Sequence, residues 1–461
     1  MCRRFFPIGC FIAGALLSLS NAEAQSPNGE IVVLKNVRVI DGRGGTPLDG
    51  AAIVIDDGKI QAVGPVGNLH WPASARVIDY QGKTVIPGLI SDHSHVGQVD
   101  GAGNSSQNYN RANILRQLHQ YEVYGVTTVT ALGLNGELFY PLQSDLHAGK
   151  LYGADLFGAD RGVGIPDGAP PNPPVNLPET QLYRVDTSEQ AARAVDEMAT
   201  RHPDLIKLWL DDFHGTLRVK MQPGVYQAVI NEAHKKGLRV AAHIYYLADA
   251  KDVVNAGVDI IAHGVRDQPV DADFIRSMKE RSVWYIPTID LDESSYIYAE
   301  NPAWLSQPFA QHALQPMLRS QIDDPTWKAK ILSNQKKIET DKASVAMNER
   351  NLKTLYDAGV KIGFGTDSGA VPLRVPGLAE HRELQLMVES GLTPLQAIDI
   401  ATHNAAELLH LTDRGVIAPG MIADLVVING NPTTNIKEIH KIEAVWHRGK
   451  LVNVTPEAFT P

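Results

Sequence analysis

The sequence predicts an α/β protein: a (β/α)8 barrel of the TIM type with a small β-sandwich domain formed by both chain ends. Three observations predict this architecture. Short β-branched runs bounded by Gly and Asp lie at both ends, strands alternate with helices between them, and 461 residues suffice for one enlarged barrel with an attached domain.

Residues 25–86 and 412–461 are expected to form the two parts of the sandwich. The first part contains "EIVVLKNVRVIDG" and "GAAIVIDDGKIQAVG", and the last contains "ADLVVING" and "IEAVWHRGKLVNV". Apolar, β-branched runs separated by turn residues are typical of strands.

Residues 87–411 are expected to form the barrel. Helical stretches such as residues 188–202 and 224–237 fall between most of the strands, which favours parallel βα units. The eight predicted strands are residues 85–90, 127–131, 154–158, 205–210, 238–243, 260–263, 284–288 and 361–365.

Two insertions interrupt the alternation. Residues 159–178 are rich in Gly and Pro, are not expected to form regular structure, and follow the third strand, which places them on the active face. Residues 290–350 are partly helical and rich in aromatic residues. This second insertion is either a helical elaboration packed on the barrel, or a lid or oligomer contact.

The first 24 residues have the order of a secretory signal peptide. Arg3 and Arg4 precede an apolar stretch over residues 5–19, and Ala22-Glu23-Ala24 has the form of a cleavage site. A membrane anchor is the alternative, but the stretch is shorter than the roughly 20 residues of a comfortable span. We expect cleavage after Ala24, a periplasmic or secreted location and no stable membrane anchor.

Both cysteines, Cys2 and Cys10, lie within this segment. The mature chain is therefore expected to have no disulfide, no catalytic thiol and no cysteine-ligated zinc. Any metal ion must then be held by histidine, carboxylate or a less common ligand.

The composition bears on the class of partner. The chain is 44% hydrophobic and 20% charged, which is ordinary for a protein with a large buried core. The formal net charge is −10, and no block of Lys or Arg stands out. We expect a small-molecule substrate and no nucleic acid partner. The oligomeric state is left open, with a homo-oligomer as one alternative.

Six polar residues fall at or near the carboxyl ends of the predicted strands, where the catalytic groups of such barrels gather. His93 and His95 follow the first strand, Lys207 lies in the fourth, His243 and His263 end the fifth and sixth, and Asp367 follows the eighth.

Each of these residues alone has a structural interpretation. A single histidine at a strand end is usually a hydrogen-bonded structural residue, and Asp367 in "GTDSG" is suited to cap a helix. Lys207 is harder to explain, because it lies within an apolar strand, where an unpaired lysine is costly to bury. Their combination in one barrel favours a metal site.

The chain resembles the amidohydrolase superfamily, and specifically its imidazolonepropionase-like and Xaa-Pro dipeptidase-like members. The resemblance covers nearly all of the mature chain and includes the β-rich ends. The matching segments are "VIDGRGGTPLDGAAIVIDDGKIQAVG", "VIPGLISDHSH", "HIYYLADAKDVVNAGVDIIAHG", "GTDSG", "GLTPLQAIDIATHNAAELL" and "GVIAPGMIADLVVING".

The resemblance implies two divalent metal ions. His93, His95 and Asp367 would bind one ion, His243 and His263 would bind the other, and Lys207 would bridge both as a carboxylate formed with CO2. Burial favours the neutral amine that such a reaction needs. Histidine and carboxylate ligands suit Zn2+, and manganese, cobalt and iron stay open. The centre would activate a bridging hydroxide, and Asp367 would transfer its proton.

One position departs from the family pattern. Members usually carry Asp two residues before the first metal histidine, whereas this chain has Ser91 there and Asp92 one residue later. The hydrogen-bonded support of the ligands is therefore expected to differ. The remaining histidines considered are not expected to be ligands: His214 and His234 lie in a loop and on a helix, and His381 and His403 are given structural roles.

Substrate contacts are predicted from the residues that follow the ligands. Tyr245 and Tyr246 are candidates to bind an oxyanion or a substrate carboxylate, and Arg266 is a candidate to pair with a carboxylate. Arg374, in "LRVPG", lies just after the eighth strand. Surface or packing roles are the alternative for each.

The function implied by the resemblance is metal-dependent hydrolysis of an amide bond in a dipeptide or N-acyl amino acid. A hydrolase of a lactone, carbamate or cyclic amide is the alternative, because the same centre serves several electrophiles. A non-catalytic metal-binding barrel is a more distant alternative.

Overall fold

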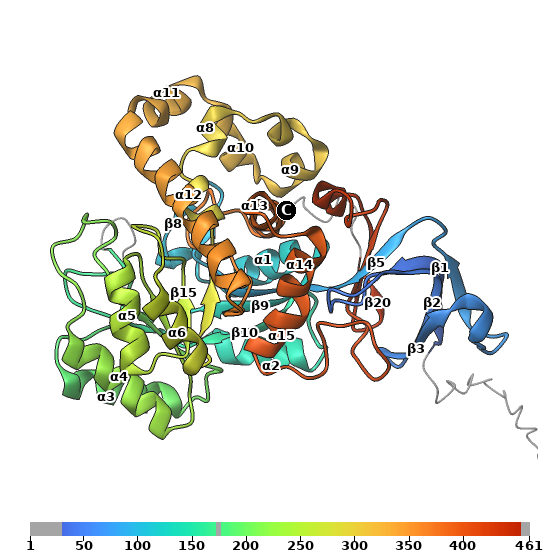
Figure 1. Cartoon of the computed structure of the whole chain (residues 1–461), viewed down its shortest axis with the longest axis horizontal. Helices are drawn as coiled ribbons and strands as arrows, with labels where there is room; N and C mark the ends of the chain where they lie inside the picture. The colour runs from blue at the N-terminus through green and yellow to red at the C-terminus, as the bar shows by residue number, and fades with distance from the viewer. Residues whose placement is uncertain (1–29, 172–176, 453–461) are drawn as a thin grey trace, which may run out of the picture.

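The computed structural model describes residues 30–171 and 177–452, arranged as a mixed α/β structure (Figure 1). The predicted signal peptide lies outside these residues, and the domain limits at residues 86/87 and 411/412 remain predictions. Within the described part of the chain, we find no helix with the length and apolar character needed to cross a membrane.

One eight-stranded sheet brings the two ends of the chain together, in blue and red in Figure 1. Strand β5 lies between β1 and β18, so that strands from the N-terminal and C-terminal parts of the described chain belong to one sheet. The strands of this sheet are β1 (Val32–Val39), β2 (Leu48–Asp56), β3 (Lys59–Pro65), β4 (Arg76–Asp79), β5 (Thr84–Pro87), β18 (Leu425–Ile428), β19 (Ile442–His447) and β20 (Lys450–Leu451).

Eight parallel strands follow one another in chain order between these ends. They are β6 (Leu89–Ser94), β9 (Val126–Leu132), β10 (Asp155–Ala159), β13 (Ile206–Trp209), β14 (Val240–His243), β15 (Ile260–Ala262), β16 (Trp284–Ile286) and β17 (Lys361–Ile362). Each pairs with its neighbour in the sequence, except that β10 and β13 are joined by the bridge Ala159–Leu205, and β6 meets the β17 end through the bridge Ser94–Ser368.

Helices follow most of these strands and cover them with apolar faces. In α3, Ala191, Ala194, Val195 and Met198 are buried at helical spacing, and the Thr187 side chain caps the first turn. These helices are α1 (Arg111–Val123), α2 (Phe139–His147), α3 (Ser188–Ala199), α4 (Pro223–Lys235), α5 (Leu247–Ala256), α6 (Ala272–Glu280), α13 (Leu378–Glu389), α14 (Pro394–Asp399) and α15 (Ala405–Leu408).

The predicted insertion at residues 290–350 is helical and stands to one side of the parallel strands (Figure 1). Its last helix, α12, is the longest of the described helices and returns the chain to β17. The helices are α7 (Asp290–Glu293), α8 (Ile297–Glu300), α9 (Pro308–Ala313), α10 (Pro316–Asp323), α11 (Pro325–Ser333) and α12 (Gln335–Asp357).

Short elements complete the chain. Residues 159–178 were not expected to form regular structure, but they contain the two-residue strand β11, which pairs with β12 and β13. The short strands are β7 (Val99–Asp100), β8 (Gly103–Asn104), β11 (Val163–Gly164) and β12 (Tyr183–Arg184). The single helical turns are η1 (Val66–Asn68), η2 (Ser106–Asn108), η3 (Ala303–Ser306), η4 (Ile400–Asn404) and η5 (Ile436–His440).

The first predicted strand, residues 85–90, is wrong as a single element. The chain divides at Gly88, so that β5 enters the mixed sheet and β6 begins the parallel strands. Gly88 passes so close to Thr127 that a Cβ atom would lie 2.2 Å from Thr127 Oγ1, and its N–H donates to Asp424 O at 2.8 Å. His93 therefore lies inside a strand, rather than after one.

A buried group of charges joins the parallel strands to the mixed sheet. Asp155 on β10 is 1% exposed and accepts hydrogen bonds from Arg414 at 2.6 Å and from Arg448 at 2.6 Å. His447, at the end of β19, pairs with Glu122 on α1 at 2.7 Å. Burial alone would raise the pKa of Asp155, but His447 and the two guanidinium groups hold it well below its usual range.

We predict that Asp155→Asn lowers the free energy of unfolding by about 3–5 kcal/mol, because it leaves Arg414 buried beside a neutral amide. The measurement is denaturant unfolding near neutral pH. Asp49→Asn is the matched control, since the Asp49 side chain is 70% exposed and pairs with Arg38 at the surface. Equal stability losses in the two variants would contradict the prediction.

The same cluster predicts an alkaline loss of stability. Burial alone would lower the pKa of His447, but Asp424, Asp155 and Glu122 raise it to about 10, above the unfolded value of about 6.5. The contribution of His447 is therefore complete below about pH 6.5 and is lost as the pH rises towards about 10. His447→Gln should differ most from wild type near pH 6 and little near pH 10. Unfolding of both proteins, with exposed His70→Gln as control, tests this dependence.

Candidate metal centre

The six residues predicted as metal ligands meet at one end of the parallel strands. They come from β6, β13, β14 and the turns after β6, β15 and β17, and none is more than 8% exposed. These residues are His93, His95, Lys207, His243, His263 and Asp367.

Asp367 lies at the centre of the first group. Its Oδ1 atom is 3.2 Å from His93 Nε2 and 2.9 Å from His95 Nε2. Lys207 Nζ lies 3.3 Å from the same nitrogen of His93. The polar atoms of one carboxylate, two imidazoles and one amine therefore lie close together.

His263 lies next to His93, and His243 lies next to His263. The imidazole rings of His93 and His263 are 4.5 Å apart between centroids, and those of His263 and His243 are 4.4 Å apart. Ligand atoms of His93, His263 and Asp367 all lie within 4.8 Å of one another. The structure thus brings the six residues together, as the sequence predicts for one site.

Hydrogen bonds fix three of the histidine rings. His95 Nδ1 is 3.2 Å from Gly133 O, and His263 Nδ1 is 2.9 Å from Thr288 Oγ1, so each ring presents its Nε2 side to the site. His243 instead has its Nε2 atom 3.2 Å from the carboxylate of Asp211. Such partners orient the histidines that bind metals in proteins.

Two of the six residues have uncommon backbone conformations. The φ angles are 133° at His263 and 62° at Asp367, in the region that favours glycine. A strained backbone persists where the surrounding structure over-determines it, and such residues cluster at functional sites.

Burial lowers the pKa values of Lys207, His93, His243 and His263. It lowers the pKa of Lys207 to about 7, against the opposite effect of Asp367 and Asp211. It also lowers the pKa values of His93 and His263 well below the usual range and lowers that of His243. The lone pairs of these nitrogens are consequently available near neutral pH.

Asp367 stays charged. Burial alone would raise its pKa, but the Arg374 guanidinium and hydrogen bonds from His93 and His95 hold the pKa well below its usual range. A carboxylate among imidazoles and a partly neutral amine is a donor set that suits a divalent cation such as zinc.

The position that departs from the family pattern is buried beside the site. Ser91 Oγ lies 2.7 Å from Ser94 Oγ and donates to Glu380 at 3.3 Å. Asp92 accepts from Phe364 N at 3.0 Å, and burial raises its pKa well above the usual range. Among the described residues, these hydrogen bonds of Ser91 and Asp92 are made to Ser94, Glu380 and Phe364 and not to the predicted ligands.

A cavity of about 590 Å3 opens beside the six residues and has two unlike walls. One wall is apolar, contains part of the Gly/Pro-rich insertion, and consists of Leu134, Pro170, Pro171, Leu177, Trp209 and Phe213. The other is polar, comes largely from the helical insertion, and includes His214, Arg266, Asp292, Asn334, Lys336, Lys337, Thr340 and Asp341.

Of the predicted substrate contacts, Arg266 and Arg374 line this cavity, and Tyr245 and Tyr246 are not among its lining residues. The Tyr245 hydroxyl lies 3.0 Å from Ser344 Oγ, and the Tyr246 hydroxyl donates to Asp212 at 3.0 Å. Arg266 is bound to Asp292 at 3.1 Å, and Arg374 is bound to Asp367. The tyrosine hydroxyls are therefore used in packing.

The other histidines are placed by ordinary contacts, with one exception. His234, His381 and His403 bond to Asp259, Tyr124 O and Asp399, respectively. His214, which was not expected to be a ligand, lines the cavity and has a ring nitrogen within 4.8 Å of carboxylate oxygens of Asp292 and Asp341. Arg266 and Lys337 already pair with these two carboxylates.

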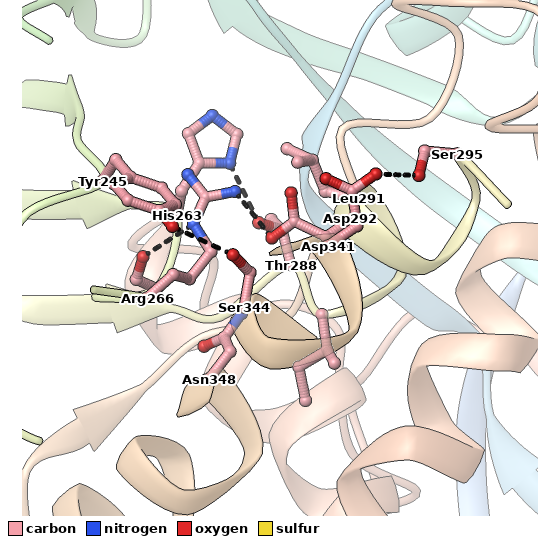
Figure 2. Close-up of polar contacts among 12 residues, drawn as sticks. Tyr245, His263, Arg266, Thr288, Leu291, Asp292, Ser295, Asp341, Ser344 and Asn348 are labelled. Carbon is pink, nitrogen blue, oxygen red and sulfur yellow. Dashed lines mark hydrogen bonds and ion pairs between the residues drawn. The ribbon is translucent and has the colours of Figure 1, made fainter. Parts of the chain in front are cut away.

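Helix α12 contacts the loop that carries His263, because Asn351 Nδ2 donates to Val265 O at 2.9 Å. Figure 2 shows further contacts of this helix beside the site. Asp341 accepts a hydrogen bond from Ser295, Ser344 contacts Tyr245, and Asn348 Nδ2 donates to Pro287 O at 2.8 Å. Residues 341, 344 and 348 share one helical face. The helical insertion is thus packed against the loops after β14, β15 and β16.

Two features of the site were not predicted from the sequence. Asp211 follows the strand of Lys207 in "LWLDD", a signal that could have identified a buried carboxylate. The polar face of α12 gives no local signal, because its partners lie in loops that are distant in the sequence.

Comparison with known proteins connects this site to a family. The amidohydrolase family model matches residues 84–452. A prolidase structure, complexed with N-methylphosphonate-L-proline, has a TM-score of 0.70 and 25% identity, and the match covers 92% of this chain and 99% of that chain. The ochratoxinase structure from Aspergillus niger has a TM-score of 0.71 at 21% identity, covering 92% and 95%. These neighbours imply a TIM-barrel-like α/β fold.

Curated relatives match over shorter segments. The adenine deaminase of Lysinibacillus sphaericus is 35% identical over 119 residues, which are 25% of this chain and 19% of that protein. The ochratoxinase of A. niger is 25% identical over 240 residues, which are 50% of this chain and 42% of that protein. The matched segments thus span less than half the length of either relative.

We predict a measurable coupling between α12 and the loop of His263. A Cβ atom at Gly264 would lie 1.8 Å from Asn348 Oδ1, so Gly264→Ala should cost about 1–3 kcal/mol of folding free energy. Asn348→Ala removes the obstructing atoms and should relieve part of that cost in the double variant. A double-mutant cycle of unfolding free energies measures the coupling.

Gly45→Ala is the control for this cycle, because no atom lies within 4 Å of a Cβ there. Additive effects of the two substitutions, within about 0.5 kcal/mol, would contradict a fixed contact between helix and loop.

Proposed function

The chain belongs to the amidohydrolase family, and on that premise we propose that it is a metal-dependent hydrolase acting on carbon–nitrogen bonds. The resemblance predicted from the sequence is confirmed by the match over residues 84–452. The observation that carries the proposal is the convergence of His93, His263 and Asp367, with ligand atoms within 4.8 Å of one another, beside a buried lysine.

We assign the family architecture to the two sets of strands. The eight parallel strands in chain order, with bridges at Ala159–Leu205 and Ser94–Ser368, support a closed (β/α)8 barrel. The sheet formed by β1–β5 and β18–β20 supports a β-sandwich domain built from both ends.

The proposed centre would hold two divalent ions, and zinc is the metal that best suits the donor set. His93, His95 and Asp367 would hold one ion and His243 and His263 the other, with Lys207 between them. Bound ions would polarise a scissile carbonyl and lower the pKa of a water molecule.

Lys207 is proposed to act as a carboxylate. Burial lowers the pKa of its amine to about 7, so a substantial neutral fraction exists near neutral pH. The neutral Nζ adds to CO2 and releases one proton, which gives a carbamate with one negative charge and two oxygen atoms. This change replaces a buried amine, which has one lone pair, by a group able to contact both ions.

Asp367 is the proposed proton carrier. Its Oδ2 atom is held by Arg374 and its Oδ1 faces His93 and His95. The low pKa keeps it ionised, so it can accept a proton from the attacking water and deliver it to the leaving nitrogen. Water adds to the carbonyl carbon, the carbon–nitrogen bond breaks, and a carboxylic acid and an amine result.

The substrate is proposed to be a small amide, such as a dipeptide or N-acyl amino acid. The cavity of about 590 Å3 has a volume typical of small-molecule sites. The apolar wall with Trp209 and Phe213 suits an acyl or side-chain group, and the polar wall suits charged substituents. The similarity to a prolidase at 25% identity supports this class.

We predict that the purified chain contains two divalent ions, loses amide hydrolysis after chelation and regains it with zinc. Lys207→Ala should lower kcat/KM by more than about 100-fold, because partners that merely orient a ligand already account for 10- to 100-fold effects. Elemental analysis and hydrolysis of a panel of dipeptides and N-acyl amino acids, with lactones for contrast, test this.

Lys361→Ala is the control, since Lys361 pairs with Glu407 at the surface. Activity that resists chelation, or that survives Lys207→Ala at the level of the control, would overturn the proposed function.

A further inference from the structure

Asp211 is a buried carboxylate behind the predicted ligand His243. It follows β13 by two residues and is 0% exposed. Its Oδ1 atom is 3.2 Å from His243 Nε2 and accepts the Phe213 N–H at 2.9 Å. Within the described residues, its Oδ2 atom has no hydrogen-bond partner.

The chemistry of this contact fixes the state of the imidazole. An ionised carboxylate only accepts hydrogen bonds, so the contact at 3.2 Å favours the tautomer of His243 that carries its proton on Nε2. The Nδ1 atom then keeps its lone pair as the free ligand position. His243 accordingly presents the opposite ring nitrogen from His95 and His263, whose Nδ1 atoms are occupied by Gly133 O and Thr288.

Asp211 also places an aromatic ring on His243. The Phe213 and His243 rings are stacked, with centroids 4.8 Å apart and planes 11° apart. Phe213 and His214 have φ angles of 49° and 59°, which are costly for non-glycine residues. The hydrogen bond from the Phe213 N–H to the Asp211 side chain is thus part of a strained turn. In this turn Asp211 contacts the edge of the His243 ring and Phe213 stacks on its face.

The charge of Asp211 points to a cation nearby. Within the described part of the chain, Asp211 pairs with His243, no Lys or Arg is bonded to either oxygen, and the charges of Lys207 and Arg266 act on it from a greater distance. A buried carboxylate is costly unless cations lie near it. A divalent ion on the other side of the imidazole would add positive charge through the ring.

We infer that Asp211 is a positioning residue that sets the tautomer and orientation of His243 for metal binding. This inference rests on the proposed metal-dependent function. It assigns to this chain a carboxylate–histidine–metal arrangement in which the carboxylate follows β13 and the histidine ends the neighbouring strand β14.

The test is the zinc affinity of the full chain, measured by competition with a chelator. Asp211→Ala should lower the affinity for one of the two zinc ions by about 10- to 100-fold. Asp212→Ala is the matched control: this adjacent carboxylate contacts Tyr246 and Gly215, not His243. If Asp211→Ala fails to fold, Asp211→Asn, which keeps the shape, should weaken zinc in the same direction by about tenfold.

A spectroscopic readout accompanies the affinity. Zinc-loaded wild type should show a downfield proton resonance from the hydrogen-bonded Nε2–H of His243, which should be absent in His243→Ala and shifted in Asp211→Asn. Wild-type affinity and an unchanged resonance in the Asp211 variants, or equal weakening in Asp212→Ala, would overturn the inference. Wild type that binds no zinc would instead overturn the proposed function.

Discussion

The buried amine of Lys207 is the constraint on which the rest of the site depends. It is 0% exposed, lies 3.3 Å from His93, and has its pKa lowered to about 7 by burial. A lysine in such a place costs folding free energy unless its charge is removed or balanced. The neighbouring histidines cannot balance it, because an imidazole is either neutral or positively charged, and only Asp367 and Asp211 act in the opposite direction on the pKa of Lys207.

The free-energy cost of burying these groups is lower if cations bind at the site. Asp367 and Asp211 bring negative charge to a region in which burial lowers the pKa values of Lys207, His93 and His263, and a carbamate on Lys207 would add more. Arg374 holds one oxygen of Asp367 from the cavity side. The site therefore gathers carboxylate oxygens and nitrogen lone pairs, which are the groups that bind cations. The surrounding elements hold these groups in place. Helix α12 contacts the loops after β14 to β16, and the cluster around Asp155 joins the parallel strands to the mixed sheet.

Much of the site could be predicted from local sequence, because polar residues that end apolar strands are conspicuous. His243 in "RVAAHIYY" and Lys207 in "DLIKLWLDD" stand out in this way. The division of residues 85–90 could not be predicted, since it depends on the approach of Gly88 to Thr127, about forty residues away along the chain. The hydroxyl of Tyr245 was expected at the substrate, but its partner Ser344 comes from a helix inside an insertion. Local pattern identifies which residues are unusual, whereas tertiary packing decides which way they point.

The central claim is that Lys207 is carboxylated between two divalent ions, and carbon NMR of the zinc-loaded chain prepared with 13C-enriched bicarbonate tests it most directly. The account predicts one carbamate carbon resonance in active wild type and none in Lys207→Ala. An active, metal-loaded wild type without such a resonance would contradict it, because Lys207 would then contribute an amine rather than a bridging carboxylate.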